Sequence, residues 1–174
     1  MLRSIKSLFG YKLAAKDGTI GKVKDFLFDQ PHWTVRWMVA DTGNWLPERK
    51  VLISPVSLGE PRWDSRLFPV RLTQDEIERA PHLDTDAPVS REYEMEWYDF
   101  YAWPYYWSGG GLWGTAAVPG ELFAPRERPV DTEPGPEARA DVIRSTKEVL
   151  GYHIAAEDGE IGHVDDAIVQ EPDW

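Results

Sequence analysis

The sequence predicts a mainly β protein with one small β-barrel, a short helical extension and a partial second copy of the barrel. The first indication is an internal repeat: residues 10–33 and 151–174 align without a gap, and 12 of the 24 aligned positions are identical. Each copy of such a repeat is expected to form the same structural unit. The second indication is a series of short apolar strands and turns after the first copy, which is typical of a small barrel.

The two copies differ in how far they continue. The first runs past Trp33 into further strands, whereas the second stops at Trp174. Half a barrel leaves strand edges and one apolar face uncovered. We therefore expect the sequence to be cut within its second unit. Two alternatives stay open: the partial copy completes itself against another molecule, or it packs on the first barrel as an appended hairpin.

The strands of the first unit follow from apolar alternation and from turn formers. Asp17 and Gly18 predict a tight hairpin turn, and the break in alternation after Val23 predicts a bulge. Gly21 indicates a bend or the close approach of another backbone. The expected strands span residues 11–15, 20–29, 33–40, 50–53, 56–58 and 66–72. Closing them into a barrel would remove their exposed edges.

Two helices are predicted after these strands. Thr73 and Glu76 form a capping-box pattern, so a short helix should run to about Arg79. A second helix should span residues 90–101, with Ser90 as its N-cap. Further on, Pro, Gly and charged residues give the composition of a linker. We therefore expect a barrel over residues 5–80, a helical aromatic-rich extension over 81–113, a flexible linker over 114–144 and a partial second barrel over 145–174.

Composition narrows the classes of protein to consider. The chain has no cysteine and no run of 18 apolar residues, so neither disulfides nor a membrane-spanning helix is predicted. Its N-terminus lacks the apolar segment of a signal peptide, which fits a cytoplasmic location. Residues 1–72 hold 12 Lys/Arg and 7 Asp/Glu, and residues 73–174 hold 7 Lys/Arg and 23 Asp/Glu. The basic half could meet RNA or an anionic membrane. Because its basic residues are scattered, we favour contact with the chain's own acidic half or with the acidic surface of a partner.

Residues 10–55 resemble the PRC-barrel family, whose barrel is SH3-like. The residues that carry the resemblance are Gly10 to Ala15, Asp17, Gly18, Ile20, Gly21, Val23, Asp25, Trp37 to Asp41 and Val51 to Pro55. The later phrases LTQDEIERAP, PVSREYE and YAWPYYW are similar to a bacterial subgroup with two barrels. The resemblance implies a PRC-type barrel that serves as a docking module, with a partial second PRC-like barrel over residues 145–174.

Two better-known groups share this barrel: the H subunit of the photosynthetic reaction centre and a ribosome-maturation factor. We expect a non-enzymatic docking or scaffold protein that binds a protein partner and needs no cofactor. The alternatives are a peripheral accessory of a membrane electron-transfer complex, and an RNA- or ribosome-associated maturation factor. Self-association through the partial repeat is a further option. The expected location is the cytoplasm, either free or peripheral to the inner membrane, and nucleic acid is not the expected partner.

An aromatic cluster supplies the candidate partner-binding residues. Nine of the 15 residues from Tyr93 to Trp107 are aromatic, and such side chains often carry the binding energy of protein interfaces. The candidates are Trp45, Trp97, Tyr101, Trp103, Tyr105, Tyr106 and Trp107. The alternative is that this segment folds back and completes the core of a barrel too small to bury much alone. Stacking on nucleic-acid bases is disfavoured, because the surrounding acidic residues repel phosphate.

No catalytic or metal-binding residue is predicted. The carboxylates Glu92, Glu94, Glu96 and Asp99 alternate with apolar residues, which favours a solvated acidic face over a catalytic pair. His153 and His163 flank one expected hairpin and could bind a metal weakly. The first copy has Lys12 and Lys22 at these positions, so a plain surface is the favoured interpretation. A small hydrolase or metal-dependent activity on the acidic segment remains the enzyme alternative.

Overall fold

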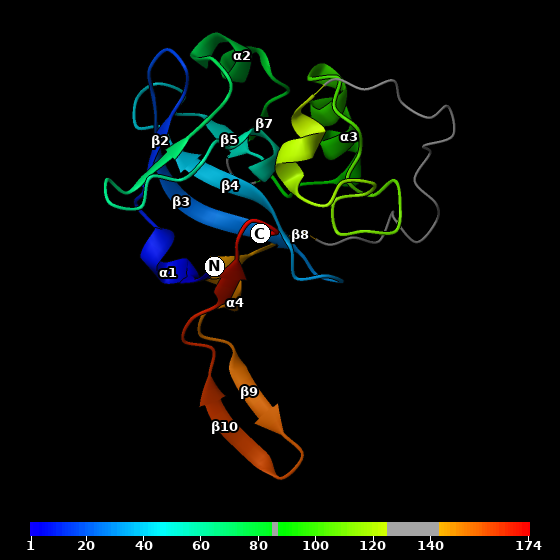
Figure 1. The fold of residues 1–174 in the computed structure, drawn as a ribbon. Helices are drawn as coiled ribbons and strands as arrows, with labels where there is room; N and C mark the ends of the chain where they lie inside the picture. The colour runs from blue at the N-terminus through cyan, green and yellow to red at the C-terminus, as the bar shows by residue number, and fades with distance from the viewer. Residues whose placement is uncertain (85–86, 125–142) are drawn as a thin grey trace.

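The computed structural model describes residues 1–84, 87–124 and 143–174, and these residues are mainly β. The largest sheet in this part of the chain has seven strands (Figure 1). Its main path runs β6 (Leu67–Pro69), β2 (Lys12–Ala14), β3 (Thr19–Asp29), β4 (Val35–Asp41), β5 (Arg49–Ile53) and β7 (Leu83–Asp84), and β8 (Ile143–Ser145) pairs with β3. The predicted fold class is thus confirmed at the level of a mainly β chain.

The hydrogen-bonding pattern of the seven-stranded sheet is that of an open sheet. Its path ends at β6 on one side and β7 on the other, and no sheet among the described residues closes into a barrel. The most deeply buried apolar side chains of this sheet include Leu13, Phe26, Trp37, Ile53 and Phe68.

Local signals in the first unit predicted several details correctly. The pairing of β3 with β4 shifts register between Val23 and Asp25, as the break in alternation indicated. Gly21 lies where β4 crosses closely: a Cβ there would be 2.0 Å from the Asp41 carbonyl oxygen. One expected strand was wrong, since residues 55–57 form a 3₁₀ helix, η1 (Pro55–Ser57). The cause is local, because Ser54 caps this turn and proline stands at its first position.

The helices lie close to their predicted bounds. In α2 (Gln74–Arg79), both halves of the capping box are formed between Thr73 and Glu76. Ser90 accepts from the Tyr93 N–H at the start of α3 (Arg91–Phe100). Residues 125–142 of the expected linker lie outside the described residues. The part that precedes them contains the 3₁₀ helix η2 (Pro119–Phe123), whose Leu122 is buried in the core.

The two copies of the repeat exchange their N-terminal strands. β1 (Leu2–Ser4) pairs antiparallel with β11 (Ile168–Gln170), with Leu2 opposite Gln170. β8 pairs antiparallel with the end of β3, with Ile143 opposite Asp29. Both pairs are related by the same offset of 141 residues as the sequence repeat. The repeat therefore begins earlier than predicted, and the exchange is reciprocal about a pseudo-two-fold axis.

Matching side-chain contacts repeat this exchange. The Asp25 carboxylate accepts hydrogen bonds from the hydroxyls of Ser145 and Thr146, just before and within α4 (Thr146–Val149). Asp166, the counterpart of Asp25, accepts from the Ser4 hydroxyl and, at 3.1 Å, from the Lys6 N–H of α1 (Ile5–Leu8). Each copy thus holds the short helix of the other through an equivalent aspartate.

The strands β9 (His153–Ala156) and β10 (Gly159–His163) form a hairpin that extends away from the rest of the protein (Figure 1). It corresponds to β2 and the first part of β3. None of the described helices has both the length and the apolar character needed to cross a membrane.

Candidate functional site

The aromatic extension is packed into the protein. Of the candidate partner-binding residues, Trp97, Trp103, Tyr105 and Tyr106 are buried in the core. Trp97 meets Trp37 of β4 edge to face, with ring centroids 4.7 Å apart. Such pairs stabilise a core beyond the apolar area that they bury. In this structure these four side chains therefore complete the core around β4, the alternative weighed for this segment.

The other three candidates are half-buried. Tyr101 donates a hydrogen bond of 3.1 Å to the Glu76 carbonyl oxygen, and Trp107 stacks on Tyr105 with ring centroids 4.6 Å apart. Trp45 packs partly against the same core. Each presents some surface to solvent, so partner binding through these three stays a prediction.

Glu94 lies at the centre of a buried polar cluster, although the sequence suggested a solvated acidic face. Its carboxylate accepts hydrogen bonds from Trp37 Nε1 at 2.9 Å and from the Tyr106 hydroxyl, and it pairs with Arg91 at 3.0 Å. Burial raises the pKa of Glu94, and the Arg91 charge opposes that shift. The spacing of Arg91 and Glu94, three apart and beside the Trp97 face of α3, was the overlooked signal.

A second buried ion pair ties β3 and β4 to the extension. Asp29 accepts from Arg36 Nη2 at 2.7 Å and from the Thr34 N–H at 3.0 Å. The Arg36 guanidinium lies 3.9 Å from the Tyr106 ring centroid and donates to the Leu112 carbonyl oxygen. Because these groups satisfy one another, the pair positions the extension and offers little polar capacity to a ligand.

The hairpin histidines approach each other as the sequence allowed. The rings of His153 and His163 have centroids 4.3 Å apart, and His153 also contacts Glu160. Within the described ranges, no group of three or more His, Cys, Asp or Glu side chains is arranged to hold a metal ion.

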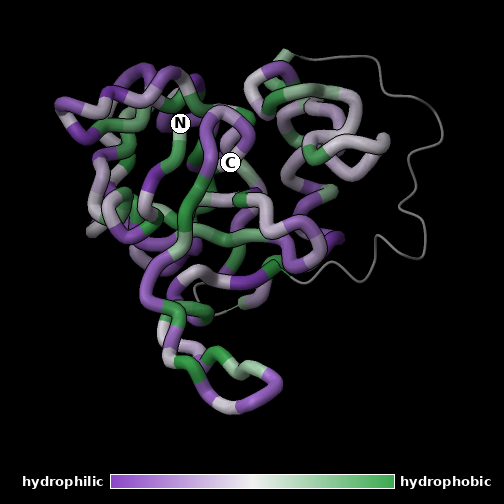
Figure 2. Tube along the Cα trace, turned by 60° about the horizontal axis from the view of Figure 1, so that its bottom comes forward, coloured by the Kyte–Doolittle hydropathy of each residue, from purple (hydrophilic) through white to green (hydrophobic). Residues whose placement is uncertain are grey.

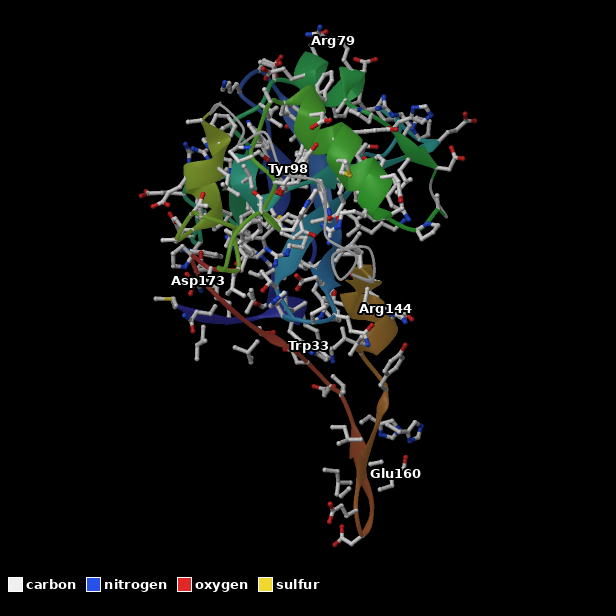
Figure 3. The ribbon with its side chains drawn as sticks, turned by 90° about the vertical axis from the view of Figure 1, so that its right-hand side faces the viewer. Trp33, Arg79, Tyr98, Arg144, Glu160 and Asp173 are labelled. Atoms are coloured by element: carbon white, nitrogen blue, oxygen red, sulfur yellow. The ribbon has the colours of Figure 1, made fainter. Side chains whose placement is uncertain are left out.

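The β9–β10 hairpin exposes apolar residues that are buried in the first copy. Ile20 is 2% exposed, whereas its counterpart Ile161 is 69% exposed. Leu13 is fully buried, whereas its counterpart Ile154 is 38% exposed. The hairpin in Figure 2 alternates between hydrophobic and hydrophilic residues, and in Figure 3 the hairpin that carries Glu160 extends away from the body of the protein.

Backbone pairing differs between the two copies among the described strands. In the first copy, β2 and β8 pair along one edge of β3, and β4 pairs along the other. In the second copy, β9 and β1 occupy the first of these edges on β10 and β11. Among the described strands, none pairs with the other edge of β10 and β11, which we call the outer edge. Unpaired N–H and C=O groups on such an edge are a template for another strand.

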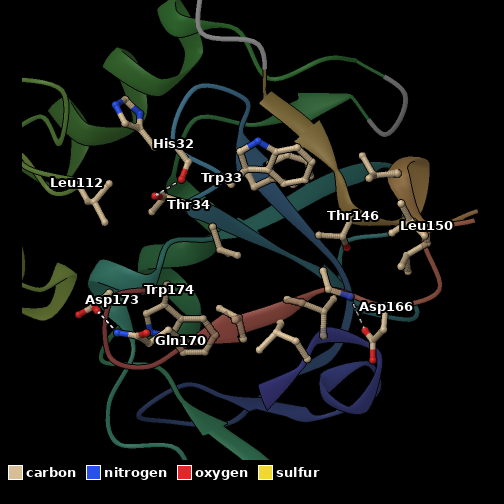
Figure 4. Close-up of a pocket in the computed structure, with 18 residues that line it drawn as sticks. His32, Trp33, Thr34, Leu112, Thr146, Leu150, Asp166, Gln170, Asp173 and Trp174 are labelled. Carbon is tan, nitrogen blue, oxygen red and sulfur yellow. Dashed lines mark hydrogen bonds between the residues drawn. The ribbon is translucent and has the colours of Figure 1, made fainter. Parts of the chain in front are cut away.

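A cavity of about 450 Å³ lies beside the outer edge, between the two copies (Figure 4). Its wall includes Val164 and residues 166–170 of the second copy, and Phe28, Trp33 and Val35 of the first. Trp174, the counterpart of Trp33, also lines it. A mainly apolar concavity next to unpaired backbone suits the side chains of an extended polypeptide.

The charge of the second copy differs from that of the first. Residues 151–174 contain seven Asp/Glu and no Lys/Arg, whereas residues 10–33 contain three Asp/Glu and four Lys/Arg. The second copy thus presents exposed apolar side chains, an outer edge and a strongly negative field. Its favoured partner would be apolar and basic.

Comparison with known proteins adds no family. A search against protein-family models gave no match for this chain. A search of curated proteins found no relative.

Proposed function

We propose that this chain is a non-enzymatic docking protein with a PRC-type barrel unit, and that it binds a protein partner through its second repeat. The parallel pairing of β2 with β6 supports a barrel-like first unit, because it brings the last strand of the unit back beside its first. The close crossing of β4 at Gly21 supports it further. We propose that the protein acts in the cytoplasm, where proteins seldom depend on disulfide bonds.

The observation that carries the proposal is the exposure of Ile154 and Ile161 on the projecting hairpin and of Ile168 on the following strand β11. Isolated apolar residues are common on protein surfaces, but several within one short stretch of chain mark an interaction site. The positions equivalent to these three, Leu13, Ile20 and Leu27, are all buried in the first copy. Contact with another protein would bury these exposed side chains.

Site-directed photo-crosslinking in bacterial cells tests this function. A photoreactive amino acid at Ile161 should give an adduct of defined mass that contains a second polypeptide. The matched control places the same amino acid at Glu60, an exposed position of the first unit, and should give none. Absence of adducts from both Ile161 and Ile154 would contradict docking through the hairpin. An adduct that nuclease removes would instead indicate RNA as the partner.

A further inference from the structure

We infer that a basic groove on the first unit binds an acidic, partly apolar segment of a partner protein. The groove has a volume of about 260 Å³ and lies on the side of β3, β4 and β5 that α4 borders. The residues that line it are Lys24, Asp25, Leu27, Val39, Ala40, Arg49, Lys50, Ser145 and Lys147. This groove is separate from the surface of the second repeat, so the inference does not rest on the docking function proposed above.

The exchange between the copies brings two lysines to this groove without a carboxylate between them. On one side of the pseudo-two-fold axis, Lys6 of α1 pairs with Asp165, with 2.8 Å between Nζ and Oδ1. The offset of 141 residues turns this pair into Lys147 and Lys24 on the other side. Within the described ranges, neither of these lysines forms an ion pair. An anion held between them would supply the negative charge that Asp165 supplies to Lys6.

Arg49 adds a third positive charge at the other end of the groove. Its Nη1 and Nη2 atoms donate to the backbone carbonyl oxygens of Glu78 and Ala80, at 2.6 and 2.9 Å. Its Nε atom is buried and has no hydrogen-bond partner among the described residues. The two carbonyl groups therefore fix the guanidinium in place without neutralising its charge. Lys50, beside it on β5, donates to the Ala87 carbonyl oxygen.

Asp25 is the acidic residue that borders the groove, and its carboxylate is already engaged. It accepts hydrogen bonds from the hydroxyls of Ser145 and Thr146 and from the N–H groups of Phe26 and Lys147. Asp25 thus holds α4 in place, while the four cationic side chains outnumber it. The groove is a region of positive charge on a chain whose net charge is −11.

The lining of the groove favours a protein segment over a phosphate or a nucleic acid. Leu27, Val39 and Ala40 give it an apolar part, which a bare phosphate would leave uncovered. None of the described residues that line it is aromatic, so bases would find no ring on which to stack. A polyanion would also be repelled by the acidic remainder of the chain. A short polypeptide segment combines carboxylates with apolar side chains and therefore matches both parts.

The sheet sets the spacing of the carboxylates in that segment. Because β5 is two strands from β3 in the order β3, β4, β5, the two ends of the groove lie about 10 Å apart. An extended chain rises about 3.3 Å per residue, so this distance corresponds to about three residues. We expect two acidic residues three positions apart, with apolar residues between them. A second copy of this chain is the less suitable partner, since two chains with a net charge of −11 repel each other.

A labelled peptide with the sequence GSEVVESG is the probe. At low salt it should bind the 1–174 protein saturably in fluorescence anisotropy, and added salt should weaken the binding. The matched peptides are GSQVVQSG, which lacks both charges, and GSESSESG, which lacks the apolar pair. Both should bind at least about tenfold more weakly than the probe.

Lys24→Asp is the decisive variant, because it gives the groove the residue that the second copy has at Asp165. The new carboxylate should pair with Lys147 as Asp165 pairs with Lys6, so the variant should stay folded while peptide binding weakens at least about tenfold. Lys22→Asp is the matched control: it makes the same change of charge at an exposed position of β3 that does not line the groove. It should weaken binding less than about threefold, because exposed charges at a distance are screened.

Further measurements separate this groove from the second repeat. Lys147→Gln should weaken binding, whereas Ile161→Asp on the hairpin should leave it unchanged. Equal effects of Lys24→Asp and Lys22→Asp, or equal binding of GSEVVESG and GSQVVQSG, would overturn the inference. Inorganic phosphate or an RNA oligonucleotide that displaces the peptide at lower concentration than unlabelled peptide does would also overturn it, as would a dimer that the peptide dissociates. None of these results affects crosslinks from Ile161, so docking through the second repeat would stand or fall separately.

Discussion

The two copies of the repeat are identical at half of their aligned positions and lie in different surroundings. Gly21, Ile20 and Val23 of the first copy are packed under β4, and the identical residues of the second copy stand in or near solvent. The difference does not come from the residues themselves, since they are unchanged. It comes from the strand that crosses them, so the same side chain is buried in the core of one copy and exposed in the other.

The positions that differ between the copies follow the same division. Phe26 and Phe28 pack in the first copy, and the smaller Ala167 and Val169 replace them in the second. Lys12 and Lys22 become histidines, which removes positive charge from the hairpin. The larger apolar side chains and the buried ion pair thus lie in the copy that packs against β4 and the extension. The second copy has smaller side chains at these positions and a more acidic surface.

The largest difference between the copies is expected at their shared glycine. Gly21→Ala should cost about 4 kcal/mol of unfolding free energy, because backbone strain adds to a collision with β4. Gly162→Ala should cost about 1 kcal/mol or less, since the projecting hairpin can relax locally. Urea unfolding of the two variants measures both values. Equal costs would show that the second hairpin is packed in solution as the first one is.

A second contrast concerns Asp29 and its counterpart Gln170. Asp29→Asn should destabilise the protein by about 3 kcal/mol, because it leaves the Arg36 guanidinium buried without its carboxylate. Gln170→Glu, the same change of charge in reverse, should change stability by no more than about 0.5 kcal/mol on its exposed strand. Both variants keep side-chain size, and thermal and urea unfolding would measure them. A small effect at Asp29 would contradict the role given to this ion pair.

The counterpart tryptophans Trp33 and Trp174 should give a smaller contrast. Trp174→Ala should cost about 2 kcal/mol, because its ring packs on Phe26 and Phe68 at the junction of the copies. Trp33→Ala should cost less than about 1 kcal/mol, since most of its ring is exposed. The same unfolding measurements apply. If Trp33→Ala proved the more costly variant, the outer edge would already be covered in solution.

Sequence reasoning succeeded where the signal was local. The hairpin turn at Asp17, the bulge after Val23 and the capping box of Thr73 each depend on residues within a few positions of one another. Those geometries are set by the preferences of single turns and caps. The mainly β class followed from the same signals, because several such turns separate several short strands.

It failed where distant segments decide the outcome. The burial of Glu94 depends on α3 meeting Trp37, 57 residues away along the chain. The exchange of β1 and β8 joins segments more than a hundred residues apart through strands of three residues, which have no sequence signature of their own. The outer edge of β10 and β11 depends on this exchange, because β1 and β9 pair with the opposite edge.

The smallest expected contrast lies at the paired aspartates that hold the exchange. Asp25→Asn and Asp166→Asn should each cost about 1 kcal/mol, because each weakens hydrogen bonds to the short helix of the other copy. Burial alone would raise the pKa of Asp166, but hydrogen bonds from Ser4, Lys6 and Ala167 outweigh it and lower this pKa. A carboxyl with a lowered folded pKa stabilises the protein above its unfolded pKa of about 4.

That stabilisation is lost as the pH falls through the lower, folded pKa of Asp166. The cost of Asp166→Asn should therefore be full at pH 7 and shrink below about pH 4, where the wild-type carboxyl also becomes neutral. Urea unfolding across this pH range measures the trend. Similar costs for Asp25→Asn and Asp166→Asn at pH 7 would support a symmetric exchange. A cost at Asp25 alone would instead mean that the second copy holds the first only weakly, and that β1 can leave β11 without unfolding the sheet.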